Sequence, residues 1–316
     1  MHILKGYTKQ EISWMMYDWA NSAHSVIIVT LLPIFFDTVA GYTADSVSSM
    51  STWGYATSIA MLIVALAAPF LGVFGDIRGM RKKLFSFFML LGVAACAGMA
   101  FTPGMDFTSG PVAAGKVASL ILVLYIVSVI GFDASAIYYD AFLTDVTIED
   151  RMDKVSTMGY GLGYIGGSTI PLLIFLIMNL VGVPMLTCLA FVFGLTAVWW
   201  LAFSLPLLKN CEQTSGKPYE KGDVARSIKG VGTTIKEIIA NKPMLIYILS
   251  YFFYIDGVHT VISMATTYGT NLGLDSTGMM LALLLVQILG LPFCLLYIKC
   301  SEKFGARTMV GFGICV

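Results

Sequence analysis

Long apolar stretches separated by short polar segments dominate the sequence. A helix that crosses a bilayer needs about 20 predominantly apolar residues, and eight stretches reach that length. They cover residues 14–37, 52–75, 83–102, 116–141, 156–180, 184–208, 243–269 and 276–299. A further apolar stretch begins near Thr308 and reaches only to Val316. The pattern therefore predicts an all-α polytopic membrane protein, truncated inside a ninth helix after about eight spans.

The longest polar stretch, residues 209–242, separates the first six predicted spans from the rest. Apolar residues recur in it every three or four positions, which is the spacing of one face of a helix. They are Val224, Ile228, Val231, Ile235 and Ile238, and basic residues flank them. A basic amphipathic helix of this kind lies on the inner membrane surface or packs on the protein's own surface. The pattern leaves both possibilities open.

Two short sequences recur in the last part of the chain. DIRGMR at residues 76–81 resembles EKFGAR at residues 302–307, and NSAHSVI at residues 21–27 resembles DGVHTVI at residues 256–262. Because both pairs follow the same order on corresponding spans, they indicate an internal repeat. The chain is expected to hold a whole six-helix half, a linker with the amphipathic helix, and the start of a second half. These parts are residues 1–208, 209–242 and 243–316.

Composition agrees with a membrane protein. The chain of 316 residues is 57% apolar and 12% charged, with a mean hydropathy of +0.82, whereas soluble domains are about 25% charged. The net charge of zero suggests no nucleic-acid partner. The six cysteines show no metal-binding spacing. Motifs of metalloproteases, serine hydrolases and phosphate-binding loops are missing from the sequence, so we expect no enzyme activity, cofactor or metal.

The basic residues predict the orientation of the spans. If the N-terminus is cytoplasmic, 18 of the 19 lysines and arginines fall in cytoplasmic segments, and Lys116 is the exception. Cytoplasmic loops carry an excess of these residues. We therefore expect an integral protein of the bacterial inner membrane with its N-terminus in the cytoplasm.

The segment between the second and third predicted spans, GVFGDIRGMRKK at residues 72–83, resembles the signature of the major facilitator superfamily. The matching residues are Gly72, Asp76, Gly79, Arg81 and Lys82. The resemblance implies a transporter that works by alternating access. Conformational gating is then expected from two sets of residues. They are Asp76, Gly79 and Arg81, and in the repeat Glu302, Gly305 and Arg307.

Four further motifs are similar to those of the vacuole-effluxer family within that superfamily. They are SWMMYDWANSAHSVIIVTLLPIFF at residues 13–36, YYDAFLTDV at 138–146, STMGYGLGYIGG at 156–167 and YIDGVHTVI at 254–262. Asp140 stands where this family usually has asparagine, and Asp133 is not a signature residue. The resemblance implies export of a small solute, which for eukaryotic members is amino acids leaving the vacuole.

Polar residues form stripes on two of the predicted spans. Asp18, Asn21, Ser22 and Ser25 follow at i, i+3, i+4 and i+7, and in the seventh span Asp256, His259 and Ser263 repeat the pattern. An ionisable group at membrane depth costs roughly 2.5–3.5 kcal/mol on insertion scales, so it usually faces a cavity. The candidate residues for substrate or proton binding are Asp256, His259, His24, Asn21, Asp18, Asp133, Tyr17 and Tyr254.

These residues predict the transported species. Burial favours the neutral forms of aspartate and histidine, which suits proton coupling. An ionised Asp256 without a basic partner in any span would bind a cationic group, such as the amino group of an amino acid. Alternatively, the stripes only join helices by hydrogen bonds. The glycines of the fifth span, residues 159–167, fit close helix packing or sliding during transport.

The sequence therefore favours a monomeric secondary transporter in the lipid bilayer that exports a small polar solute with protons. A membrane sensor or scaffold on a transporter fold is the alternative.

Overall fold

The computed structural model describes residues 4–43, 49–216, 218 and 223–315 of the chain. The helices are α1 (Lys9–Ala40), α2 (Ser49–Gly75), α3 (Arg81–Met99), η2 (Thr102–Gly104), α4 (Pro111–Val146), α5 (Glu149–Gly163), η3 (Tyr164–Thr169), α6 (Ile170–Leu180), α7 (Met185–Asn210), α8 (Asp223–Ala240), α9 (Lys242–Asn271), α10 (Ser276–Phe304) and α11 (Ala306–Cys315).

The prediction of an all-α protein with eight spans is confirmed. Within the described residues, eight helices are long and apolar enough to cross a membrane. The fifth span, Glu149–Leu180, consists of α5, η3 and α6 in direct succession. Its central segment, η3, is a π-helix, a conformation that is rare and often found at functional sites.

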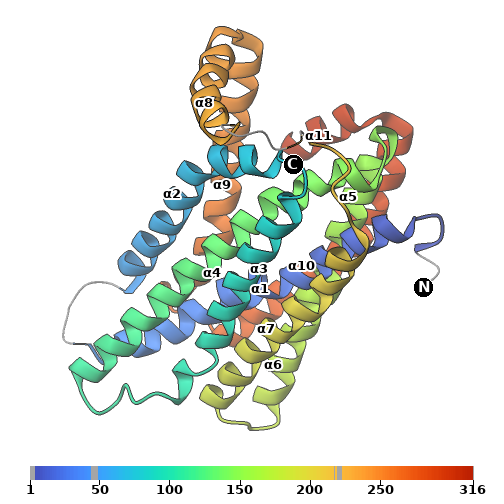
Figure 1. Ribbon diagram of the computed structural model, residues 1–316. Helices are drawn as coiled ribbons and strands as arrows, with labels where there is room; N and C mark the ends of the chain where they lie inside the picture. The colour runs from blue at the N-terminus through green and yellow to red at the C-terminus, as the bar shows by residue number, and fades with distance from the viewer. Residues whose placement is uncertain (1–3, 44–48, 217, 219–222, 316) are drawn as a thin grey trace.

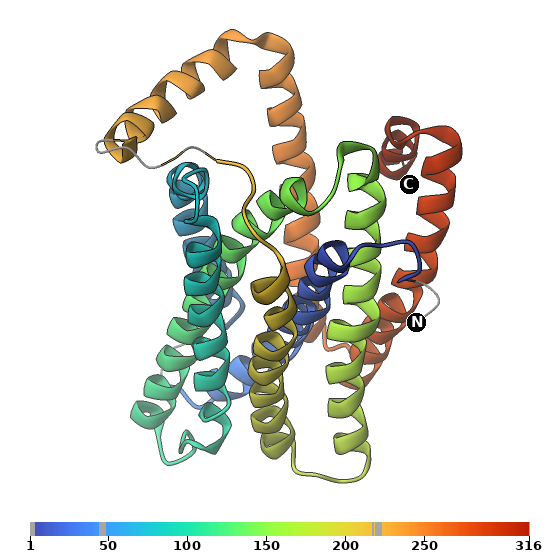
Figure 2. The ribbon, with the colours of Figure 1, turned by 45° about the vertical axis from the view of Figure 1, so that its right-hand side comes forward.

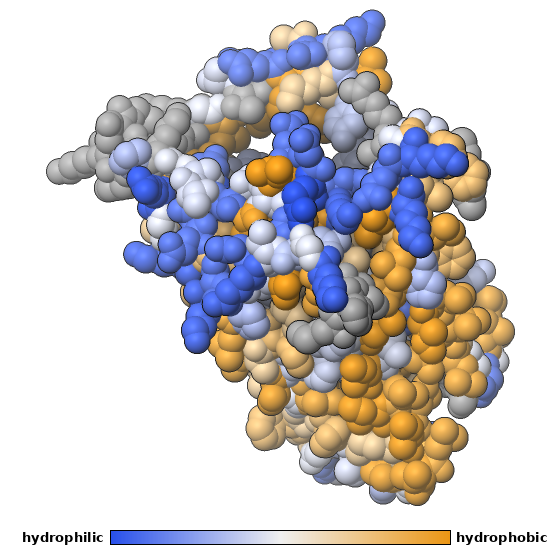
Figure 3. All heavy atoms as spheres, turned by 90° about the vertical axis from the view of Figure 1, so that its right-hand side faces the viewer, coloured by the Kyte–Doolittle hydropathy of each residue, from blue (hydrophilic) through white to orange (hydrophobic). Residues whose placement is uncertain are grey.

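The spans lie side by side (Figure 1, Figure 2). α1 is central and contacts α4, α7 and the fifth span. α9 lies against α1 and α2, and α10 lies against the fifth span. Figure 3 shows hydrophilic side chains over the upper part of the molecule and apolar ones below. We call the upper end, with α8 and the α2–α3 loop, the basic end.

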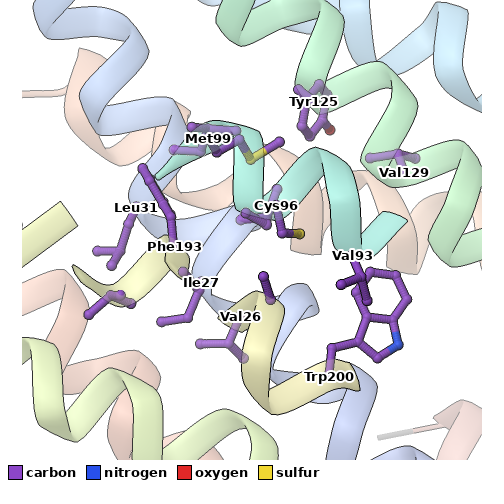
Figure 4. Close-up of a cluster of buried hydrophobic side chains, with 14 of the residues drawn as sticks. Val26, Ile27, Leu31, Val93, Cys96, Met99, Tyr125, Val129, Phe193 and Trp200 are labelled. Carbon is purple, nitrogen blue, oxygen red and sulfur yellow. The ribbon is translucent and has the colours of Figure 1, made fainter. Parts of the chain in front are cut away.

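Four helices meet in the central part of the core of the first six spans. Figure 4 shows Val26, Ile27 and Leu31 of α1 beside Val93, Cys96 and Met99 of α3, Tyr125 and Val129 of α4, and Phe193 and Trp200 of α7. Lipid tails are as apolar as these side chains, so close packing rather than escape from water holds such helices together. This core fixes α1, which carries the polar stripe.

Two glycines allow α3 and α4 to cross at backbone contact. A methyl group on Gly131 would lie 2.5 Å from Gly92 N and 2.8 Å from the carbonyl oxygen of Phe88. These are backbone atoms, so no side-chain rotation could relieve the clash. Small residues at such crossings are common in membrane proteins.

We expect Gly131→Ala to destabilise the protein by about 1–3 kcal/mol, the usual cost of overpacking. Gly115→Ala is the matched control, because Gly115 lies in the same helix and an added methyl group there meets no atom within 4 Å. That variant should gain up to about 1 kcal/mol, since alanine favours a helix more than glycine. Thermal unfolding in detergent measures both, and equal midpoints would contradict the packing argument.

A helix, α8, lies where the spacing of apolar residues predicts one. It contacts the ends of α2 and α9 at the basic end. Val231 and Ile238 are half-buried, whereas Ile235 and Ile239 are 49% and 60% exposed. The side chains of Val224 and Ile228 lie outside the described part. α8 therefore contacts α2 and α9 and leaves part of its apolar face uncovered.

Candidate functional site

The polar stripe of α1 lies against the glycine-rich face of the fifth span. A methyl group on Gly163 would stand 2.5 Å from Ser22 Oγ, and one on Gly159 would clash with the carboxylate of Asp18. Further along, Gly166 and Gly167 pack against Trp19. Only hydrogen fits between the two helices at these positions. The fifth span therefore covers the stripe, and its glycines permit this approach.

Asp18 is buried, with 7% of its surface exposed. The hydroxyl of Tyr139 on α4 donates to Asp18 Oδ2 at 2.8 Å. Tyr139 is held by Trp14, whose ring stacks on it at 4.3 Å and whose Nε1 donates to its carbonyl oxygen at 2.9 Å. The exposed carboxylate of Asp140 is near enough to interact electrostatically with Asp18. The site thus joins one buried carboxylate to one phenol between α1 and α4, and an exposed carboxylate follows that phenol in the sequence.

Tyr17 and Asn21 flank Asp18 and are both buried. The hydroxyl of Tyr17 forms a hydrogen bond of 2.8 Å with Ser135 Oγ and accepts one of 3.4 Å from Trp200 Nε1. Its ring lies edge-on to Phe85. Tyr17 therefore fixes α1 against α3, α4 and α7, inside the first six spans.

His24 lies in the aromatic core, away from the face that meets the fifth span. Its ring stacks on Phe132 at 4.8 Å and tilts against Trp200 at 5.1 Å. It is 3% exposed, and neither ring nitrogen has a hydrogen-bond partner among the described residues. A neutral imidazole packed as an aromatic ring fits this environment.

The candidates of the seventh span lie on α9 with exposed side chains. Tyr254, Asp256 and His259 are all exposed, and the described residues offer no hydrogen bond to Asp256 or His259. α9 nevertheless runs along α1. Asp133 on α4 is half-buried, and its Oδ2 has no partner in the described part of the chain. Asp18, Asp133 and Asp256 therefore stand separately rather than in one hydrogen-bonded cluster.

The loop between α2 and α3 centres on Arg81, which is the first residue of α3. Its guanidinium forms a close ion pair with Asp145 at the end of α4, and both side chains are buried. Asp76, the acid of the same signature, lies 3.8 Å from Arg81 with 81% of its side chain exposed. Gly79 has a φ of +80°, which glycine adopts without strain. The Asp76–Arg81 contact exists, but Asp145 is the stronger partner.

The repeated sequence at residues 302–307 makes a contact that the sequence does not predict. Glu302 Oε1 accepts from Lys154 Nζ of α5 at 2.8 Å, and Ser301 Oγ donates to Asp153 Oδ2 at 2.6 Å. Gly305 has a φ of +82°, close to that of Gly79. The side chain of Arg307 lies outside the described part. α10 and the fifth span are thus joined at the basic end.

Closer to the middle of the spans, α10 touches the fifth span at two glycines. A methyl group on Gly290 would overlap the ring of Tyr164 in η3, and one on Gly161 would lie 2.8 Å from Leu291 Cδ1. The π-helical segment therefore lies between α1 on one side and α10 on the other.

The sequence alone does not predict Tyr139, Asp145 and Lys154 as partners of the candidate residues. Tyr139 and Asp145 both lie in YYDAFLTDV, the motif that resembles the vacuole effluxers. That motif marks the end of α4 as important but gives no partner, because each contact joins residues more than 60 positions apart.

Two solved transporter structures share this arrangement of helices. The crystal structure of a D-xylose-proton symporter matches over 94% of this chain and 69% of its own, with a TM-score of 0.58 and 15% identity. The xylose transporter XylE from E. coli matches over 94% and 73%, with a TM-score of 0.54 and 14% identity. At these identities the likeness shows that the chain shares the fold of these transporters.

Sequence comparison then gives the family. The profile described as "Vacuole effluxer Atg22 like" matches residues 39–151 and 144–316. The "Uncharacterized MFS-type transporter YxiO" of Bacillus subtilis (strain 168) is 39% identical over 322 residues, covering 99% of this chain and 72% of that protein. "Autophagy-related protein 22-1" of Penicillium rubens is 24% identical over 185 residues, covering 55% and 31%. The chain belongs to the Atg22-like vacuole effluxer family of MFS-type transporters.

Proposed function

We propose that this protein is a secondary active transporter that exports a small polar solute, such as an amino acid, by alternating access coupled to protons. One observation carries this proposal. Asp18 is a buried carboxylate whose described partner is the Tyr139 phenol, with Asp140 as a second acid nearby. An isolated buried charge is costly, so Asp18 is stable when it holds a proton and must lose that proton when water reaches it.

Tyr139 and Asp140 give Asp18 a route to solvent. Asp140 is exposed and directly follows Tyr139 in α4. The Tyr139 hydroxyl donates to Asp18. We propose that water entering between these groups takes the proton from Asp18 and carries it to the exposed carboxylate of Asp140. Separation of α1 from the fifth span would admit water to Asp18 and allow this step.

Asp256 is proposed as the binding residue for the amino group of the substrate. It is exposed on α9, a helix that contacts α1. No lysine or arginine occurs between Lys242 and Lys299, so a neutral His259 would leave Asp256 without a positive side chain along the rest of α9. A substrate ammonium group would supply the missing positive charge.

We also propose how the protein is oriented in the membrane and which contact closes its cytoplasmic side. The excess of lysine and arginine supports a cytoplasmic location for the basic end and the N-terminus. Residues 1–208 are proposed as one rigid half, residues 209–242 as the linker, and residues 243–316 as the beginning of the other half. The Lys154–Glu302 ion pair would then close the cytoplasmic side and break when that side opens.

A proton-flux screen tests this function. The full-length protein is placed in liposomes that contain a pH-sensitive dye, and the common L-amino acids are added singly. At least one should drive proton movement in the wild type. Asp256→Asn should give none with the same amino acid, because the ammonium group loses its partner. If wild-type liposomes show neither proton movement nor labelled uptake with any amino acid, amino-acid export is excluded.

A further inference from the structure

The segment that follows α7, residues 211–216, folds back onto the basic end instead of leaving it. Cys211 Sγ lies 3.7 Å from the carbonyl oxygen of Gln10 in α1. The segment then passes the α2–α3 loop and the end of α4, where Gln213, Thr214, Ser215 and Gly216 make contacts. α8 is the next described helix and contacts both α2 and α9.

Gln213 bridges the two ends of the α2–α3 loop. Its Nε2 donates to the carbonyl oxygen of Gly75, the last residue of α2, at 2.9 Å. Its Oε1 accepts from the backbone N–H groups of Gly79 and Arg81 at 2.9 and 3.3 Å. The first N–H groups of a helix lack partners within the helix, and Met80, which precedes α3, provides no side-chain cap. Gln213 therefore caps α3 from a distant part of the chain.

Thr214 and Ser215 bind the acid that pairs with Arg81. Asp145 Oδ1 accepts from the backbone N–H groups of Thr214 and Ser215 at 3.1 and 2.9 Å, and from both of their hydroxyls at 2.8 Å. Arg81 Nη1 also donates to Ser215 Oγ at 3.3 Å. The linker, the loop and the end of α4 thus share one hydrogen-bond network around Arg81.

Gly216 brings the linker backbone into contact with the α2–α3 loop. A methyl group on it would lie 2.7 Å from the carbonyl oxygen of Asp76 and 3.3 Å from the N of Arg78, and its φ is +117°. Both the space and the backbone conformation require glycine here. The linker backbone therefore lies directly on the loop that carries the gating residues.

We propose that residues 213–216 form a clamp by which the linker controls the gating loop. Gln213 is the positioning residue: it holds the loop closed over the start of α3 and so keeps Arg81 against Asp145. Displacement of the linker frees the N–H groups of Gly79 and Arg81 together, and the loop loosens while the helices on either side remain folded. This places control of the loop in the segment that leads to α8 and α9.

Hydrogen exchange of the full-length protein in detergent tests the clamp without a transported substrate, so its result is independent of the proposed function. Gln213→Met retains length but removes the donor and the acceptor. Peptides covering residues 75–83 should exchange about fivefold faster, the effect of losing roughly 1 kcal/mol of hydrogen bonding. Peptides covering Thr214 and Ser215 should change little, because Asp145 still binds them.

Two further variants make the result specific. Gln213→Glu keeps the acceptor and loses the donor. The exchange rate of residues 75–83 should therefore lie between that of the wild type and that of Gln213→Met. Glu212→Gln alters the neighbouring exposed residue, which makes no hydrogen bond within the described part of the chain, and should match the wild type. Unchanged exchange of the loop in Gln213→Met would overturn the proposal. Faster exchange throughout the first six spans would overturn it too, because Gln213 would then act on overall stability.

Discussion

Asp18→Asn is expected to abolish proton-driven accumulation of substrate while leaving exchange of substrate across the membrane partly intact. Asparagine has nearly the same shape and still accepts from the Tyr139 hydroxyl, which lies 2.8 Å from Asp18 Oδ2. It cannot carry a proton. The variant should therefore fold, bind substrate and move it, but lose the link between substrate and proton. The experiment uses the amino acid that the proton-flux screen identifies, as labelled uptake into liposomes with and without a pH gradient.

Two further variants separate the roles of the carboxylates. Asp256→Asn should lose exchange as well as accumulation, because it acts on substrate binding. Tyr139→Phe keeps the ring that stacks on Trp14 at 4.3 Å but removes the hydrogen bond to Asp18. It should shift the pH dependence of uptake and leave the affinity for substrate nearly unchanged. Normal accumulation by Asp18→Asn would remove Asp18 from the coupling mechanism.

Arg81→Ala is expected to be among the most destabilising single changes in the basic end. It leaves the buried carboxylate of Asp145 without its positive partner, and breaking a buried ion pair in this way costs about 3–5 kcal/mol. The four hydrogen bonds from Thr214 and Ser215 to Asp145 remain and place the expected cost at the lower end of that range. Thermal unfolding in detergent measures the loss.

Asp76→Asn is the matched control for Arg81→Ala. Asp76 lies 3.8 Å from the same guanidinium but is 81% exposed, and exposed ion pairs contribute little. The unfolding midpoint of Asp76→Asn should stay near that of the wild type. If Asp76 serves the conformational cycle, this variant should slow transport without weakening substrate binding. Equal stability of Arg81→Ala and the wild type would contradict the importance of the Arg81–Asp145 pair.

The helices were predictable from the sequence because their signals are local. Each span needs only a continuous apolar stretch, and α8 needs only apolar residues at helical spacing. Even the polar stripe of α1 follows from positions 18, 21, 22 and 25 lying on one helix face. The glycines of the fifth span also predicted close packing, and the structure shows that packing between Gly163 and Ser22.

The contacts of the site were not predictable in the same way. Tyr139 lies 121 positions from Asp18, and Gln213 lies 134 positions from Gly79. No local pattern distinguishes Tyr139 from its neighbour Tyr138, whose hydroxyl instead donates to the carbonyl oxygen of Leu71. His24 shows the same limit: its place within a predicted span makes it a candidate, but the sequence does not tell which side chains surround its ring. Such pairings depend on how the helices rotate and cross, which local spacing does not define.

We propose that proton movement and substrate movement are linked through Asp18. The most direct test measures both fluxes at once in the same liposomes, with an enclosed pH dye and a labelled amino acid. For the wild type, proton flux should rise and fall with amino-acid flux as the substrate gradient is varied. For Asp18→Asn, the amino acid should move without protons. Amino-acid transport by the wild type with no accompanying proton movement would contradict the account.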